Sequence, residues 1–272
     1  MADKIENPSE SIIPVSSNSG TFPPSTAAVP APPVTYVLRV CCINLNGTDK
    51  IRLIATPPTL VDPIKQTILA CWGPIQKEGN YAGAHEYKLL GNPWNGDGIE
   101  AVNSRKLLVG LLRTMAQHGW NLIQASDVSK KHYDKDSLFF EGSMVPVVGQ
   151  IDMFSISFHG TDRIRLIDVP PFIVPLVKGA IQAHWRKGIQ SLTLFFKAHE
   201  FKLNGNPFWG DGEDTVLAHV MLAQILSTLR EQGYKLYSSA NISSGQPGGL
   251  GSQSYVHYTE AWVFRRVGPS WS

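Results

Sequence analysis

Two His-Glu pairs are the residues of this chain whose types best suit acid-base chemistry. His85 and Glu86 form the first pair, and His199 and Glu200 form the second. An imidazole and a carboxylate are standard partners in general acid-base catalysis. Both pairs lie in segments that favour β-strands, in which adjacent side chains point to opposite faces of a sheet. We therefore expect each histidine to anchor its loop, and each glutamate to pair with a lysine on the other, solvated face.

The residues that other chemistries need are missing from the sequence. His85 with Asp97, or His199 with Asp211, offers two metal ligands, whereas a zinc site needs three or four. Glycines before a long helix suggest phosphate binding, but no Gly-Lys-Ser/Thr follows them, and an aspartate at that helix start repels an anion. The serines lack a Gly-x-Ser-x-Gly elbow. The sequence therefore predicts no catalytic residue, no metal site and no cofactor.

Both histidines belong to a fourteen-residue stretch that the chain carries twice, at 85–98 and 199–212, with ten of the fourteen positions identical. A Gly-Thr-Asp-basic-Ile-Arg-Leu-Ile string at 47–54 and 160–167 aligns the two copies further. This repetition predicts a tandem duplication of a module of about 115 residues. The predicted organisation is a disordered Ser/Pro-rich tail at 1–34, a first module at 35–145, a second module at 146–267, and an unordered tail at 268–272.

Each module predicts an α+β fold in the order β-β-α-β-α-β-β, with both helices packed on an antiparallel-rich sheet. A hairpin turns at Gly47 or Gly160, because glycine adopts positive φ easily. A Pro-Pro pair ends the second strand, and an amphipathic helix follows. That helix closes with Trp72 or Trp185, which we expect to be core residues.

A long helix is predicted at 99–118 and again at 213–232. Asp97 and Asp211 are predicted as its N-caps, and Gly119 or Gly233 is expected just after its end. An aspartate at the N-cap accepts hydrogen bonds from the free amides of the first turn, and a glycine easily adopts the left-handed conformation that follows a helix end. The second copy of this helix is apolar nearly all round, which predicts cover on two sides. We expect one side to meet its own sheet and the other to meet the sister helix in a pseudo-twofold pair. An external partner or a lipid is the alternative cover.

Composition narrows the class of partner. The chain has 272 residues, with 43% hydrophobic and 17% charged, and a net charge of +2. No run of basic residues exceeds a pair, which gives no footprint for nucleic acid or for an anionic membrane. No stretch reaches the length of a membrane span. All three cysteines (Cys41, Cys42 and Cys71) lie in the first module, which predicts reduced core thiols in a cytoplasmic or nuclear protein.

The Asn-Pro-aromatic turns and the basic residues beside them are the candidate surface for a ligand or a protein partner. The residues of this candidate surface are His85, Lys88, Pro93, Trp94, His199, Lys202, Pro207, Phe208 and Trp209. The leading hypothesis is a non-enzymatic intracellular binding or scaffold protein. One alternative is a hydrolase or transferase that uses His85 or His199 with a carboxylate. Another is a carrier of a small hydrophobic ligand, which requires a cavity between the long helices.

The repeated string His-Glu-aromatic-Lys-Leu-x-Gly-Asn-Pro-aromatic, followed by a long helix and a closing strand such as 136–140, resembles a module of an uncharacterised eukaryotic protein family. The resemblance covers both copies, from Tyr36 to about Val267. It implies the same tandem organisation. The family brings no established activity with it, so the resemblance assigns no catalytic or binding residue.

Overall fold

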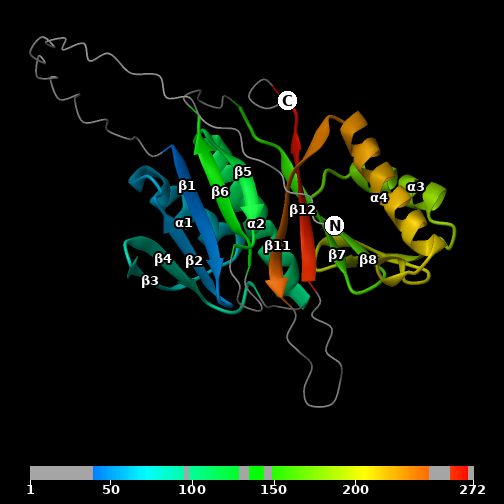
Figure 1. Cartoon of the computed structure of the whole chain (residues 1–272), viewed down its shortest axis with the longest axis horizontal. Helices are drawn as coiled ribbons and strands as arrows, with labels where there is room; N and C mark the ends of the chain where they lie inside the picture. The colour runs from blue at the N-terminus through cyan, green and yellow to red at the C-terminus, as the bar shows by residue number, and fades with distance from the viewer. Residues whose placement is uncertain (1–38, 95–97, 129–134, 144–148, 245–257, 269–272) are drawn as a thin grey trace, which may run out of the picture. The chain divides into compact units, whose positions relative to one another are not determined.

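Two six-stranded antiparallel sheets, each with two helices, make up the described part of the chain. The computed structural model describes residues 39–94, 98–128, 135–143, 149–244 and 258–268 (Figure 1). This arrangement confirms the α+β fold and the tandem duplication predicted from the sequence. The predicted N-terminal tail, the glycine-rich insertion of the second copy and residues 269–272 lie outside the described residues.

The first module contains sheet A, in the strand order β3-β4-β2-β1-β6-β5. Its elements are β1 (Val40–Asn46), β2 (Lys50–Ile54), α1 (Val61–Cys71), β3 (Ile75–Tyr81), β4 (Ala84–Leu89), α2 (Gly98–Gln117), β5 (Trp120–Ser126) and β6 (Ser137–Gly142). Gly47 turns the β1–β2 hairpin with φ of 60°, as predicted. Apolar side chains from alternate strand positions pack against the helices on the inner face of the sheet, as the period of a strand requires.

The second module contains sheet B, in the strand order β11-β12-β7-β8-β10-β9, which is the order of sheet A read from the other edge. Its elements are β7 (Met153–His159), β8 (Arg163–Ile167), α3 (Ile173–His184), β9 (Ile189–Phe195), β10 (Ala198–Leu203), α4 (Glu213–Glu231), β11 (Tyr234–Ser244) and β12 (Tyr258–Arg266). Helices α3 and α4 lie together beside β7 and β8 (Figure 1).

Each module has one strand more than the predicted order, because the strand around each histidine is half of a hairpin. The extra strands are β3 and β9, at one edge of their sheets. Six of the seven residues of β3 are exposed, so it carries almost no apolar signal. An edge strand with one neighbour and little burial is held by ladder hydrogen bonds to β4, which hydrophobic periodicity does not report.

The tryptophans that close the short helices are buried to different extents. Trp185 is fully buried, and its Nε1 donates to the carbonyl oxygen of Asn204 at 2.9 Å, which confirms the predicted core position. Trp72 is only partly buried, and its Nε1 donates to the carbonyl oxygen of Leu90 at 2.8 Å. In each module this bond ties the helix end to the strand that carries the histidine.

The long helices begin and end close to the predicted positions, but the predicted N-cap is wrong in the second copy. Gly212 is the N-cap of α4 with φ of 56°, and no side chain caps the helix. Asp211 is exposed and takes no part in the helix start, since a left-handed glycine now makes the turn into the helix. Asp97 lies outside the described residues. Gly119 and Gly233 follow the two helices with φ of 80° and 81°, as predicted.

The predicted pseudo-twofold pairing of the long helices is wrong. The helix pairs in extensive contact are α1 with α2 and α3 with α4, and α2 packs instead on β7 and β8 of the other module. Arg113 Nη2 donates to the carbonyl oxygen of Met153 at 2.8 Å, and Lys106 Nζ lies 3.1 Å from Asp168 Oδ1. The second side of α2 is therefore covered by sheet B, and beside this contact strand β5 meets strand β11, where Leu122 N donates to Tyr237 Oη at 2.7 Å.

Candidate functional site

The two histidines of the predicted site lie in different sheets, His85 on β4 and His199 on β10. His85 packs edge-on against Tyr87, with ring centroids 4.6 Å apart, while the intervening glutamate points to the other face of sheet A. The His85 Nε2 atom lies 3.0 Å from Glu78 Oε1 on β3. The neighbouring Lys65 ammonium group is the main cause that lowers the pKa of Glu78. Glu78 therefore lies between His85 and Lys65 in a partly exposed polar cluster.

The Asn-Pro-aromatic turn of the first module does not form a contact surface. Trp94 is fully buried, and its Nε1 donates to the carbonyl oxygen of Lys50 at 2.9 Å. Pro93 is buried beside it. Lys88 remains partly exposed, with its Nζ 3.7 Å from Asp49 Oδ2. The sequence could not separate Trp94 from an exposed aromatic, because a tryptophan in a polar turn reaches the core only through the tertiary fold.

The matching turn of the second module is more open. Pro207 is buried, and Phe208 packs edge-on against Phe158 at a centroid distance of 5.3 Å. Trp209 is 58% exposed, and Lys202 is partly exposed on β10. Among the predicted surface residues, Trp209 is therefore the aromatic that a partner can reach.

An ion pair stacked on an aromatic ring marks the outer face of sheet A, the face that points away from its helices. The Arg52 Nε atom lies 2.6 Å from Glu86 Oε2. The Arg52 guanidinium also lies over the Tyr81 ring, 4.2 Å from its centroid, in a cation-π contact. We call Arg52, Glu86 and Tyr81 the Arg-Glu-aromatic unit of the first module. It spans the neighbouring strands β2, β4 and β3.

The second module repeats the Arg-Glu-aromatic unit on sheet B with the same geometry. The Arg165 Nε atom lies 2.6 Å from Glu200 Oε2, and the Arg165 guanidinium lies 3.8 Å from the Phe195 ring centroid. The two units differ in cover, because Arg165 and Glu200 are buried while Arg52 and Glu86 are partly exposed. A signal for both units was present in the sequence, since the arginine and the glutamate occur at matching strand positions in both copies.

Helix α2 covers the Arg-Glu-aromatic unit of the second module. Burial and the charges of Arg105, Arg165 and Arg163 lower the pKa of His159 from 6.5 to about 2. The neutral His159 accepts from Arg165 Nη1 through Nδ1 at 3.1 Å, and its Nε2 lies 2.8 Å from Ser157 Oγ. Burial first, and Arg165 second, lower the pKa of Arg105 on α2 to about 9. These shifts show how fully α2 removes this polar face from water.

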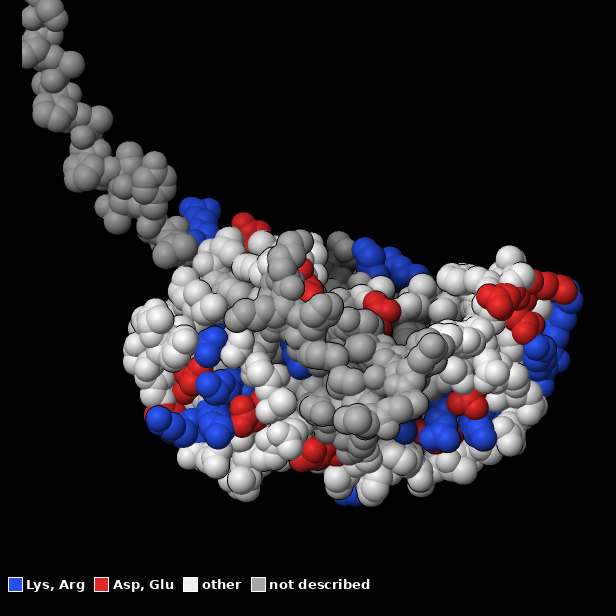
Figure 2. Space-filling view, turned by 60° about the horizontal axis from the view of Figure 1, so that its bottom comes forward, with Lys and Arg blue, Asp and Glu red and all other residues white. Residues whose placement is uncertain are grey.

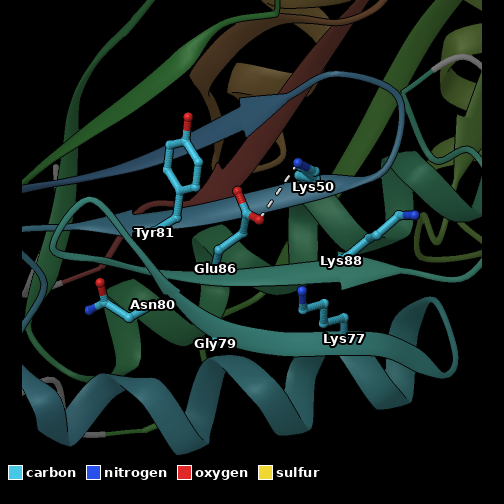
Figure 3. Close-up of a pocket in the computed structure, with 7 residues that line it drawn as sticks. All are labelled: Lys50, Lys77, Gly79, Asn80, Tyr81, Glu86 and Lys88. Carbon is cyan, nitrogen blue, oxygen red and sulfur yellow. Dashed lines mark ion pairs between the residues drawn. The ribbon is translucent and has the colours of Figure 1, made fainter.

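A surface pocket lies beside the open unit of the first module. It has a volume of about 320 Å³ and is lined by Lys50, Lys77, Gly79, Asn80, Tyr81, Glu86 and Lys88. Figure 3 shows the lysine, glutamate and tyrosine side chains rising from neighbouring strands on one side of the sheet. Lys50, Lys88 and Lys77 stand opposite one another in the strand register, which places three like charges in a row. Lys50 Nζ lies 3.7 Å from Glu86 Oε1 and Lys88 Nζ lies 3.7 Å from Asp49 Oδ2, so carboxylates of the same chain balance two of the three charges.

Basic and acidic side chains are interspersed on the face shown in Figure 2, so no large field of one sign is visible there. Among the described residues, no group of three or more His, Cys, Asp and Glu side chains is placed to hold a metal ion. Within the same residues, no helix is long and apolar enough to cross a membrane. Cys41 and Cys42 are buried free thiols, and burial raises the pKa of each to about 11.

A domain-family model matches the chain twice, over residues 39–141 and 152–265. The two matched ranges contain nearly all of sheet A and nearly all of sheet B, each with its helices. A search of curated proteins finds no match.

Proposed function

We propose that this chain, which belongs to the domain family whose model matches it twice, is a non-enzymatic binding protein. Its proposed recognition surface is the outer face of sheet A. One observation carries the proposal. In the second module helix α2 covers the Arg-Glu-aromatic unit, whereas within the described residues no helix covers the unit of the first module, whose Arg52 and Glu86 side chains are each 17% exposed. We therefore propose that the first module binds a helix of a protein partner. With reduced thiols in its core, the protein acts inside the cell.

The chemistry of the open face supports a helical partner. Ile54 at the end of β2 is 42% exposed and Tyr81 at the end of β3 is 54% exposed, so the face offers apolar contacts beside the ion pair. At the other end of these strands Lys50 and Lys88 are paired with Glu86 and Asp49. An amphipathic helix can lay its apolar side on Ile54 and Tyr81.

The two alternative functions have less support. A hydrolase or transferase needs the histidine and a carboxylate near one reacting atom. The carboxylate beside His85 is Glu78, which also pairs with Lys65 at 2.6 Å, while Glu86 is paired with Arg52 on the opposite face. A hydrophobic carrier needs a cavity between two facing long helices, but α2 faces β7 and β8 instead. The first arrangement does not favour catalysis at the histidines, and the second does not favour storage of a hydrophobic ligand between the long helices.

Site-specific photocross-linking tests the proposed function. Ile54 is replaced by benzoylphenylalanine in the full chain, and the adducts formed in the native cells are mapped by mass spectrometry. We expect adducts to a helical segment of a polypeptide. Leu194 is 70% exposed on β9 and serves as the control position for an apolar residue away from this face. Adducts only to small molecules, or the same adducts from position 194, would contradict the proposal.

A further inference from the structure

The junction between the two modules is heterologous, which means that it joins two different surfaces. The first module contributes the outer side of α2, and the second contributes the outer face of sheet B; beside them the equivalent edge strands β5 and β11 are also in contact. A heterologous junction leaves one unused copy of each surface at the two ends of the assembly. Here the unused copies are the outer side of α4 and the outer face of sheet A.

A small apolar cluster at the internal junction identifies the residues that correspond at the two unused surfaces. The cluster consists of Val102, Ile167, Ala198 and Phe195. Their counterparts in the repeated sequence are Val216, Ile54, Ala84 and Tyr81. Three of these counterparts are large and exposed, with Val216 at 62%, Ile54 at 42% and Tyr81 at 54%. The residues that meet inside the chain are therefore matched by residues that stand open at its two ends.

The positions beside this apolar cluster also correspond between the internal junction and the two unused surfaces. At the internal junction Lys106 pairs with Asp168, with 3.1 Å between Nζ and Oδ1. The counterparts are Val220, which is 43% exposed, and Ala55, which is also exposed. Both members of the ion pair have been replaced by apolar residues, so contact between them would bury no unpaired charge.

We propose that the outer side of α4 in one chain docks on the outer face of sheet A in a second copy, repeating the internal junction between chains. This inference rests on the proposed function, because it names the helix that the open face binds. Each chain offers one helix surface and one sheet surface, so chains associate head to tail. The row of three lysines stays outside the footprint, as Arg163 does on sheet B, where its side chain is 41% exposed.

Association between chains is weaker than the internal docking, because the internal junction is tethered and acts at a high effective concentration. Sedimentation velocity of the full-length chain over a range of concentrations measures it. We expect species that grow beyond dimers as the concentration rises. Val220→Asp at the α4 end and Ile54→Asp at the sheet A end should each weaken self-association by roughly tenfold or more, since each buries an unpaired charge. Leu194→Asp is the control and should leave it unchanged.

A mixture of the two variants gives the sharper test. The Val220→Asp chain keeps a good sheet surface, and the Ile54→Asp chain keeps a good helix surface. An equimolar mixture should therefore form one-to-one heterodimers and stop there, while each variant alone stays monomeric. Circular dichroism and thermal unfolding check that both variants fold; Val216→Asp and Tyr81→Ser are the second pair if either does not.

Three outcomes would overturn the inference. They are a wild-type chain that is monomeric at every concentration up to about 1 mM, a mixture of variants that fails to pair, and cross-links from position 54 to residues 1–38 of the same chain. Cross-links from position 54 to a helix of another protein would overturn the inference and leave the proposed function standing. The absence of polypeptide adducts at position 54 would remove both.

Discussion

Helices α2 and α4 occupy equivalent places in two copies of one fold, yet α2 is covered on both sides and α4 on one. The buried residues of α2 extend around the helix and include Val102, Arg105 and Val109. Those of α4 form one stripe, Ala218, Met221, Ile225 and Leu229. The composition of α4 is nevertheless apolar on its outer side as well. The outer side of α4 is therefore more apolar than the fold of its own module requires.

The Asn-Pro-aromatic turns give the largest expected difference between the modules. Trp94→Ala should lower the free energy of unfolding by about 3–5 kcal/mol, because it leaves a cavity and removes the hydrogen bond to Lys50. Trp209→Ala should change it by no more than about 0.5 kcal/mol, since that ring is 58% exposed. Denaturant titration measures both. Equal losses for the two variants would break the assignment of Trp94 to the core and Trp209 to the surface.

The second largest difference in stability is expected between the ion pairs of the two Arg-Glu-aromatic units. Glu200→Gln should cost about 3 kcal/mol, because it leaves the buried Arg165 guanidinium without its paired charge. Glu86→Gln should cost about 1 kcal/mol, because water reaches the pair with Arg52. The same titration compares them. A larger loss for Glu86→Gln would show that the face of sheet A is covered in solution.

Two valines at matching helix positions sharpen the comparison. Val102→Ala should lower the free energy of unfolding by about 2 kcal/mol, since two buried methyl groups are lost at the module junction. Val216→Ala should change it by about 0.5 kcal/mol or less, and the higher helix propensity of alanine acts in its favour. Thermal unfolding of the dilute protein measures both. A cost for Val216→Ala that appears only at high concentration would support association through α4.

The last expected effect depends on pH and comes from His159. Its pKa falls from 6.5 to about 2 in the folded chain because α2 buries it beside arginines. Below pH 6.5 the unfolded chain therefore binds a proton that the folded chain does not, and stability falls by about 1.4 kcal/mol per pH unit as the pH decreases. His159→Asn introduces the residue found at the matching position, Asn46, and should flatten this slope between pH 6.5 and 5. An unchanged slope would show that α2 does not keep His159 from water.

Much of the fold could be predicted because the sequence is repeated. The hairpin at Gly47 and the glycines after both long helices follow from local backbone preferences, and the structure has them where they were expected. The edge strand β3 was missed because its side chains are polar and exposed. The N-cap at Asp211 was wrong because a left-handed glycine makes that turn instead. Local sequence patterns predict a structural element well only where a single backbone conformation fits them.

The candidate site was harder to predict than the fold. Every residue of the Arg-Glu-aromatic units was visible in the sequence, but strands that carry them are far apart in the chain and meet only in the sheet. The sequence drew attention to the turn aromatics, of which Trp94 is in the core. A residue type in a turn does not reveal which way its side chain points once the sheets are packed.

The sequence by itself determined that this protein has two copies of one α+β module, because identical local patterns fold into identical local structure. It also determined that the second long helix is apolar nearly all round. Only the tertiary structure decided which surface covers which, because that choice depends on contacts between residues far apart in the sequence, such as Arg113 and Met153. It placed sheet B against α2, and among the described residues it left the outer side of α4 and the outer face of sheet A uncovered. Two sets of equivalent residues therefore have different environments within one chain.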